Sequence, residues 1–387
     1  MAERPKQPRT RPFDTIALLL QGGGALGAYQ GGVYQALAEA NVYPNWVAGI
    51  SIGAVNAALI VGNPPETRVA RLREFWEAVS SPPLGVLYNP PILLKEPATH
   101  RFLNHIHACL IALFGAPSFF APRFPPAEFW PSQPPDKLSF YDVAPLKATL
   151  ERLVDFRRIN NGDIRLSIGA VNVRSGNSAS FDNTTHKIDV RHVLASGSLP
   201  PGFPATEIEG QYYWDGGIVS NTVLQTMLDC GPQRDTLAFQ VDLWSASGEL
   251  PHDLAQADSR EKDIRYSSRT RTATEQFRTA QRARHALRLV LDRLPDSVRS
   301  SPEIEQLAHE ANENVYNIVH LIYHARSYEG IQKDYEFSRR TMEEHWRTGY
   351  EDASRALSHS EIFERPDTID GVRAFDFSEC DSPSSKN

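Results

Sequence analysis

The first sixty residues alternate twice between a short apolar run and a helical pattern. Residues 15–20 are apolar and β-prone, and the glycines at 22–24 follow them directly. Over residues 26–40 apolar side chains recur at spacings of three and four, which predicts a helix. Residues 46–50 form a second apolar run, and 52–61 are rich in alanine and aliphatic residues. This order of strand, turn and helix predicts an α/β domain with a mainly parallel sheet.

Strand patterns return in the second third of the chain. Residues 163–173 alternate between apolar and polar positions, and 178–183 are expected to pair with them as a hairpin. Residues 193–204 are a loop of small residues, 212–228 pass from a strand through a turn into a helix, and 236–244 form a further strand. These elements extend the predicted sheet.

The composition changes after residue 250 to charged, helical patterns. Long helices are predicted over 275–294, where a proline ends the pattern, over 303–325 and over 334–356. The sequence therefore divides into four parts. They are a disordered tail (1–14), an α/β domain (15–250), a helical C-terminal extension (251–378) and a second tail (379–387).

Residues 82–135 interrupt the α/β domain with many prolines and aromatic residues. Proline removes a backbone donor and clashes with the preceding helical turn, so no long regular element is expected here. The apolar stretch 106–121 is shorter than the roughly 20 residues needed to cross a bilayer. Two interpretations remain open: a buried cap over the α/β core, or a mobile lid whose residues 102–124 make a peripheral contact with a membrane.

Composition and charge narrow the function classes. The hydrophobic content of 41% and the charged content of 22% are those of a globular protein. The formal net charge of -7 argues against nucleic acid as the main partner, because a phosphate backbone requires a basic surface. The cysteines at 109, 230 and 380 are too scattered for a disulfide framework or a zinc site. Carboxylates and histidines show no ligand spacing, so no metal and no cofactor are expected.

The N-terminal residues are polar and lead into an apolar run that is too short for a secretory signal. Together with the scattered cysteines, this favours a cytoplasmic protein, with the membrane contact of residues 102–124 as an alternative peripheral location.

Gly49, Ile50, Ser51, Ile52 and Gly53 match the G-x-S-x-G pattern of a nucleophile elbow. A serine between a strand and a helix requires a strained backbone, and small residues two positions away on either side allow the turn to close. The following helix directs its amide N–H groups toward this point. The five letters alone also fit a plain packing turn, but their position between a predicted strand and an apolar helix favours Ser51 as a nucleophile.

Gly22, Gly23, Gly24 and Gly27 match a G-x-G-x-x-G pattern between a strand and a helix. A dinucleotide site would require an acidic residue at the end of the second strand, where this chain has Ser51. A structural turn is another interpretation. We favour an oxyanion hole formed by the amides of Gly22, Gly23 and Gly24, because glycine amides can approach a substrate carbonyl closely.

Asp215, Gly216 and Gly217 follow an aromatic strand and open a helical stretch. By itself this triplet indicates a turn. Its significance comes from its place after the other two motifs.

In this order the motifs resemble the patatin-like phospholipase family. The chain contains LLLQGGGALGAYQGGVYQAL, AGISIGAVNAAL, ASGSLPPGFP and WDGGIVSNTVL over roughly residues 15–245. Residues 334–356 also resemble the C-terminal extension of a bacterial branch of the family. The resemblance implies a three-layer α/β fold and hydrolysis of lipid acyl esters, commonly phospholipids, by a Ser–Asp dyad that uses neither a catalytic histidine nor a metal.

Carried over motif by motif, the resemblance implies that Ser51 is the nucleophile and Asp215 its general base. The amides of the Gly22–Gly24 loop form the oxyanion hole. Two positions depart from the family pattern: Leu26 stands where many relatives have Arg or Lys, and Val223 stands where some have proline. The glycines that support the motif turns are Gly27, Gly49, Gly53, Gly216 and Gly217.

Two rival functions remain to be tested. A Ser-His-Asp hydrolase would take its histidine after the acid, from His252, His285 or His320. A non-catalytic, membrane-associated regulator or scaffold would keep the patatin fold without turnover.

Overall fold

The computed structural model describes residues 13–81, 97–125, 131–221, 223, 234–267, 270–295, 298, 301–302, 304, 307–308, 311, 313–326 and 328–377. Both predicted tails lie outside these residues, except for Phe13 and Asp14, as does most of the helix predicted to follow Asp215.

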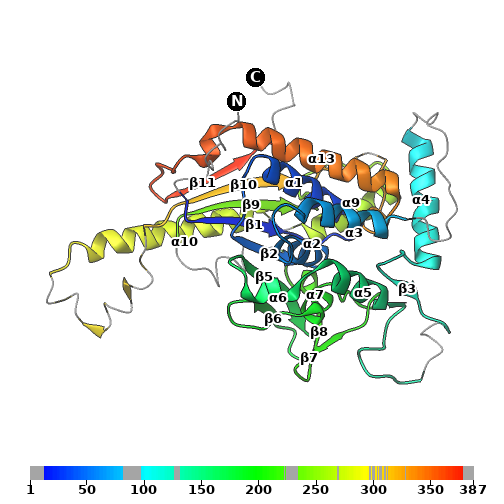
Figure 1. The fold of residues 1–387 in the computed structure, drawn as a ribbon. Helices are drawn as coiled ribbons and strands as arrows, with labels where there is room; N and C mark the ends of the chain where they lie inside the picture. Colours follow the sequence, from blue (N-terminus) through cyan, green and yellow to red (C-terminus); the bar gives the residue numbers. More distant parts are fainter. Residues whose placement is uncertain are drawn as a thin grey trace, which may run out of the picture.

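The described part of the chain is built around a nine-stranded central sheet (Figure 1). Its strands are β1 (Thr15–Leu20), β2 (Trp46–Ile50), β5 (Arg165–Asn172), β6 (Ser178–Asp182), β7 (Thr206–Ile208), β8 (Gln211–Asp215), β9 (Thr236–Asp242), β10 (Tyr316–Ile322) and β11 (Val372–Asp376). The strand order is β11-β10-β9-β1-β2-β5-β8-β7, and β6 also pairs with β5. From β11 to β5 all pairs are parallel, whereas β6, β8 and β7 pair antiparallel at one edge.

Helices cover both faces of this sheet. The helices before β5 are α1 (Ala28–Glu39), α2 (Ile52–Val61), α3 (Arg68–Val79), α4 (Pro97–Phe114), α5 (Ala144–Leu153) and α6 (Phe156–Asn161). Those after it are α7 (Val190–Ser196), α9 (Leu254–Tyr266), α10 (Thr270–Leu291) and α13 (Arg339–Ser358). Short 3-10 turns are η1 (Gly24–Gly27), η3 (Gly216–Ile218) and η4 (Ser360–Phe363), and β3 (Ala121–Pro122) pairs with β4 (Tyr141–Asp142).

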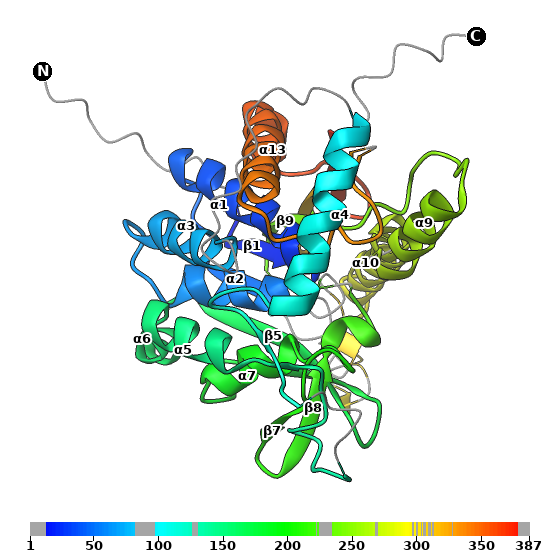
Figure 2. The same ribbon diagram turned by 90° about the vertical axis from the view of Figure 1, so that its right-hand side faces the viewer.

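The side chains of β1 alternate between two hydrophobic cores, which defines three layers. Leu18 and Leu20 pack in the core that includes side chains of α1, α2, α3 and α13. Ala17 and Leu19 pack in the other core with Phe277 of α10. Figures 1 and 2 show α1, α3 and α13 on one side of the sheet and α10 on the other. The predicted three-layer α/β fold with a mainly parallel sheet and C-terminal helices is therefore confirmed.

The C-terminal part also contributes two strands to the sheet. The helix predicted over 303–325 is wrong, because Tyr316–Ile322 forms β10, which lies between β9 and β11. A short apolar run fits a buried strand as well as a buried helix, and pattern alone does not separate them. Helix α13 also packs closely on α1 of the N-terminal half. A Cβ on Gly32 of α1 would lie 1.8 Å from the carbonyl oxygen of Trp346 on α13.

The proline-rich segment contains a long helix, contrary to the prediction that no long regular element occurs in 82–135. Helix α4 has 18 residues. It forms because the prolines lie at its start, Pro97, and beyond its end, Pro117, where they break no internal hydrogen bond. Among the described residues, no helix is both long and apolar enough to cross a membrane.

Candidate active site

Ser51 lies at the sharp turn between β2 and α2. Its backbone is left-handed, with φ 56° and ψ −125°, which is uncommon and strained for a residue other than glycine. The flanking glycines allow the chain to turn here. A Cβ on Gly49 would lie 2.3 Å from the carbonyl oxygen of Gly53, and one on Gly53 would lie 2.1 Å from that of Leu20.

A second serine holds the backbone of Ser51. The Ser51 amide donates to Oγ of Ser196 at 2.9 Å, and that hydroxyl donates to the carbonyl of Gly169 at 2.6 Å. Ser196 is the last residue of α7 and links β2 and β5. No local pattern in the sequence marks Ser196, although it lies in the ASGSLPPGFP segment.

Asp215 is the last residue of β8 and is 3% exposed. Its carboxylate accepts a hydrogen bond from the Gly217 amide at 2.8 Å. Burial raises the pKa of Asp215 to about 6, against the lowering effect of hydrogen bonds from the Ser51 side chain and the Gly217 amide. The structure thus brings the two predicted catalytic side chains together. Gly216 allows the close approach to β5, since its Cβ would lie 2.8 Å from the carbonyl oxygen of Gly169.

The glycine loop lies directly against Ser51. A Cβ on Gly22 would be 2.9 Å from the Cβ of Ser51. The Gly22 amide is already used, because it donates to Oδ1 of Asn221 at 3.0 Å. In the described part of the chain, nothing accepts a hydrogen bond from the amides of Gly23 and Gly24. Both of these glycines are partly exposed.

The end of the glycine loop is packed tightly. Gly24 has a φ of +56°, and a Cβ there would lie 2.0 Å from the carbonyl oxygen of Asp334, which accepts the Ala25 amide at 2.7 Å. Gly27 allows the loop to approach α2, since its Cβ would lie 2.6 Å from Cγ1 of Ile52. Leu26, at the position where many relatives have a cation, is fully buried in the core.

Two distant side chains and one distant backbone carbonyl hold the loop in place. Asn221 bonds to both the amide and the carbonyl of Gly22, and the indole N–H of Trp244 donates to the same carbonyl. Gln21 and Asn221 both donate to the carbonyl of Tyr266. Asn221 lies in the WDGGIVSNTVL segment, but no local pattern in the sequence marks Trp244 or Tyr266.

The three histidines of the rival Ser-His-Asp hypothesis lie elsewhere. His320 is on β10, three strands from β2, which corresponds to about 14 Å at the usual strand spacing. His285 is on α10 and contacts the Asn314 carbonyl, and His252 is in the exposed segment before α9. Within the described residues no histidine is hydrogen-bonded to Ser51 or Asp215, and no group of three His, Cys, Asp or Glu is arranged to hold a metal ion.

Comparison with protein families gives two matches. Residues 18–228 match the patatin-like phospholipase family, and residues 264–368 match a family described as patatin phospholipase. The chain therefore belongs to the patatin-like phospholipase family. A search of curated proteins found no match.

Comparison with solved structures gives distant similarities. VipD from Legionella pneumophila is 16% identical, with a TM-score of 0.39, over 89% of this chain and 67% of that protein. ExoU from Pseudomonas aeruginosa, solved with SpcU, is 17% identical, with a TM-score of 0.26, over 67% of this chain and 51% of that one. At these TM-scores the similarities carry no conclusion about function.

Proposed function

We propose that this protein is a serine acyl hydrolase that cleaves carboxylic ester bonds of lipids, with Ser51 as nucleophile and Asp215 as general base. The observation that carries the proposal is the place of the Ser51 side chain against the buried Asp215 carboxylate, where the serine lowers the pKa that burial raises. A pKa of about 6 suits this role, because a base that titrates just below neutral pH is deprotonated in the resting enzyme yet still binds a proton.

The reaction follows from these groups. Asp215 accepts the hydroxyl proton of Ser51 as its Oγ attacks the ester carbonyl, and the resulting oxyanion receives hydrogen bonds from the amides of Gly23 and Gly24. Asp215 then returns the proton to the departing alcohol, which leaves an acyl ester on Ser51. A water molecule, deprotonated by Asp215, then attacks the acyl carbon; the bond to Ser51 Oγ breaks, Asp215 returns the proton to this oxygen, and the fatty acid is released.

The donors of the proposed oxyanion hole differ from the three amides that the sequence predicts. Of the three predicted donors, Gly22 already has an acceptor in Asn221, so Gly23 and Gly24 are the proposed donors. The start of α2 adds the Ile52 amide, which follows the nucleophile and has no acceptor in the described structure. Gly22 remains important because its missing side chain leaves room for Ser51.

The proposal is tested with a fluorophosphonate, whose phosphorus reacts with an activated serine hydroxyl and releases fluoride. We expect the protein to hydrolyse p-nitrophenyl acyl esters and to lose this activity in step with modification of Ser51, as located by mass spectrometry. Ser175, in the turn after β5, serves as the internal control and should stay unmodified, as should the Ser51→Ala variant. Esterase activity that persists after full modification of Ser51 would contradict the proposal, and no esterase activity at any chain length would favour the scaffold.

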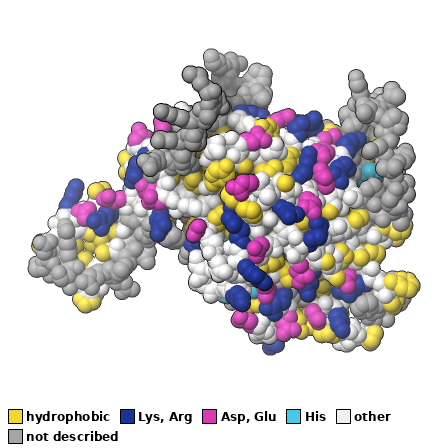
Figure 3. Space-filling model, viewed as in Figure 1, with side chains coloured by type: hydrophobic (Ala, Val, Ile, Leu, Met, Phe, Trp, Pro, Cys, Tyr) yellow, Lys and Arg dark blue, Asp and Glu magenta, His cyan; other side chains and the backbone are white. Residues whose placement is uncertain are grey.

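The exposed face of α4 is the proposed lipid contact. Ile106, Leu110, Leu113 and Phe114 lie on one side of the helix and are 37% to 65% exposed. Ile111 on the opposite side is buried. Figure 3 shows hydrophobic side chains gathered at the right-hand edge, on the side where α4 and β3 lie in Figure 1. Within residues 103–124 some apolar side chains are thus buried and others are exposed, and the exposed ones support the proposed contact with a membrane.

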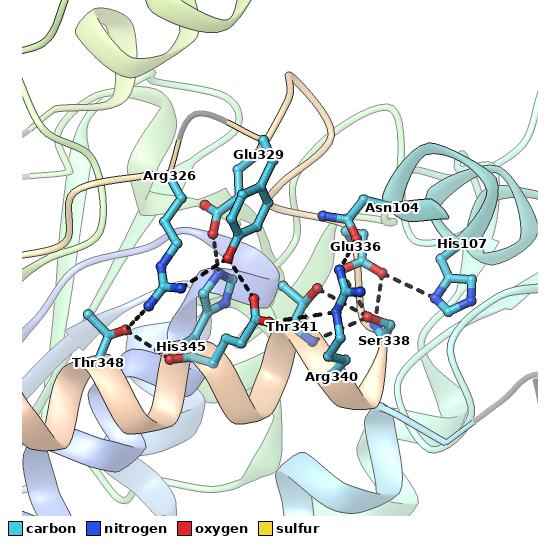
Figure 4. Close-up of polar contacts among 12 residues, drawn as sticks. Asn104, His107, Arg326, Glu329, Glu336, Ser338, Arg340, Thr341, His345 and Thr348 are labelled. Carbon is cyan, nitrogen blue, oxygen red and sulfur yellow. Dashed lines mark hydrogen bonds and ion pairs between the residues drawn. The ribbon is translucent and has the colours of Figure 1, made fainter. Parts of the chain in front are cut away.

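Polar contacts hold α4 beside the glycine loop. Figure 4 shows Asn104 and His107 pointing toward Arg340 and Glu336, with distances of 3.2 Å to Arg340 and 3.5 Å to Glu336. These partners follow Asp334 in the chain, whose carbonyl accepts the Ala25 amide of the glycine loop. A membrane bound to the apolar side of α4 would therefore lie close to the proposed site.

We expect the double variant Leu110→Ser, Leu113→Ser to lower turnover on phospholipid vesicles at least about tenfold, because each leucine withdrawn from the bilayer removes about 1.5–3 kcal/mol. Turnover of a soluble short-chain ester should stay within about twofold. The matched control is Ile369→Ser, which changes a side chain that is 90% exposed, next to β11 at the opposite end of the molecule from α4 in Figure 1. Equal loss on both substrates would show that this face belongs to the folded core.

A further inference from the structure

The Gly22 carbonyl receives two side-chain hydrogen bonds from residues far away in the sequence. Nε1 of Trp244 donates to it at 2.9 Å, and Nδ2 of Asn221 donates at 3.2 Å. Both donors are buried, with 4% and 8% of their surface exposed. Asn221 also accepts the Gly22 amide, so this one residue bonds to both sides of the glycine.

This carbonyl belongs to the same peptide unit as the amide of Gly23. A peptide unit is planar and trans, so its N–H points away from its C=O. Two donors that fix the direction of the Gly22 carbonyl therefore also fix the Gly23 N–H, which faces away from Trp244 and Asn221. Hydrogen bonds to the carbonyl also polarise the unit and strengthen its N–H as a donor.

Both donors are supported by Tyr266, the last residue of α9. Nδ2 of Asn221 also donates to the Tyr266 carbonyl at 3.0 Å, and the Tyr266 ring lies against Trp244 with centroids 5.4 Å apart. Gln21 donates to the same carbonyl at 3.1 Å and accepts the backbone amide of Trp244 at 3.2 Å. A carbonyl at a helix C-terminus has no donor within its own helix, so Tyr266 can accept both bonds.

We infer that Trp244 and Asn221 are positioning residues that orient the Gly23 amide toward the oxyanion of acyl transfer. The inference rests on the proposed function, because this oxyanion forms only in that reaction. Both residues act through the glycine loop. Tyr266 lies in the separately matched C-terminal region, 264–368. We infer that this region supports the two residues that hold the glycine loop.

Two variants test the inference with a soluble p-nitrophenyl ester. Trp244→Phe removes the indole N–H and keeps an aromatic ring against Tyr266, and kcat should fall about tenfold with KM within about twofold. Asn221→Asp places an acceptor against the carbonyls of Gly22 and Tyr266, and kcat should fall about 10²-fold. The control is Trp46→Phe, because Trp46 is equally buried and donates a bond of the same length, 2.9 Å, to Ser167. Its kcat should stay within about twofold.

A tetrahedral inhibitor separates positioning from a merely structural role. Ser51 Oγ adds to the carbonyl carbon of a trifluoromethyl ketone, Asp215 takes the hydroxyl proton, and the ketone oxygen becomes an oxyanion. The Ki should therefore rise in each variant by the factor by which kcat falls. A structural defect would lower the melting temperature and the amount of active protein, and leave the Ki of the folded fraction unchanged. If Trp244→Phe and Asn221→Asp match Trp46→Phe in kcat and Ki, the inference is overturned.

Different measurements would contradict the proposed function and the positioning role of Trp244 and Asn221. Esterase activity that survives modification of Ser51 shows that the proposed function is wrong. Crystal structures of Trp244→Phe and Asn221→Asp then decide the positioning role. A Gly22–Gly23 peptide turned relative to the unsubstituted protein supports it, and the same peptide orientation in both variants contradicts it.

Discussion

Replacing Asp215 by asparagine is expected to lower kcat by about 10²–10⁴-fold while making the folded protein more stable at pH 8. The loss of activity follows from removing the only proposed proton acceptor of Ser51, since a positioned general base contributes about that factor. Asparagine has nearly the same shape and can still accept the Gly217 amide, so the turn after β8 should remain. The measurement is kcat on a soluble ester together with the melting temperature.

The gain in stability has a definite pH window. The pKa of Asp215 is raised by burial from 3.8 to about 6, so above pH 6 the folded state holds a buried charge that the unfolded state exposes to water. At 1.36 kcal/mol for each pKa unit, this charge costs about 3 kcal/mol at pH 8. Below pH 3.8 the carboxyl is neutral in both states and the cost vanishes. The variant should therefore melt several degrees higher than the unsubstituted protein at pH 8 and at the same temperature near pH 4.

The activity of the unsubstituted protein should depend on pH in the same range. Because the base must be deprotonated, kcat/KM on a soluble ester should fall as the pH drops through about 6. A profile that stays flat down to pH 4.5, or a variant that keeps its activity, would exclude Asp215 as the base.

Replacing Gly24 by alanine is expected to lower kcat by about 10²–10³-fold, which is the effect of losing one oxyanion-hole donor. The new Cβ would lie 2.0 Å from the backbone oxygen of Asp334, and the φ of +56° adds strain for any residue with a side chain. Backbone atoms cannot rotate out of the way as a flexible side chain can, so the loop must move. The N–H groups of Gly23 and Gly24 then no longer point toward the proposed oxyanion position.

The matched control is Gly176→Ala in the turn between β5 and β6. Gly176 also has a positive φ, +70°, but a Cβ there meets nothing within 4 Å. In both variants the strained backbone should lower the free energy of unfolding by about 1–2 kcal/mol, which a melting curve measures. Only Gly24→Ala should lose activity in its folded fraction. Equal kcat in the two variants would show that the geometry of the glycine loop does not matter for turnover.

The sequence predicted the strands and turns of the N-terminal half well because their signals are local. The apolar runs at 15–20 and 46–50 became β1 and β2, and the pattern at 178–183 became the hairpin partner β6. The helix predicted over 303–325 was wrong, because the mainly apolar segment Tyr316–Ile322 forms β10. The prediction that no long regular element occurs in 82–135 was also wrong, because the prolines nearest to α4 lie at its start and beyond its end, where they break no internal hydrogen bond.

What the sequence alone determined is which groups are proposed to react: a serine between flanking glycines after a strand, a glycine run and an aspartate before two glycines. Each of these motifs consists of residues that are neighbours in the chain, so its steric requirement can be recognised from consecutive positions of the sequence. Only the tertiary structure placed Asp215 against Ser51 and surrounded the Gly22 carbonyl with Asn221 and Trp244. Those contacts depend on the order of strands in the sheet and on the path of the C-terminal part, which the packing of the whole chain decides and no local periodicity encodes.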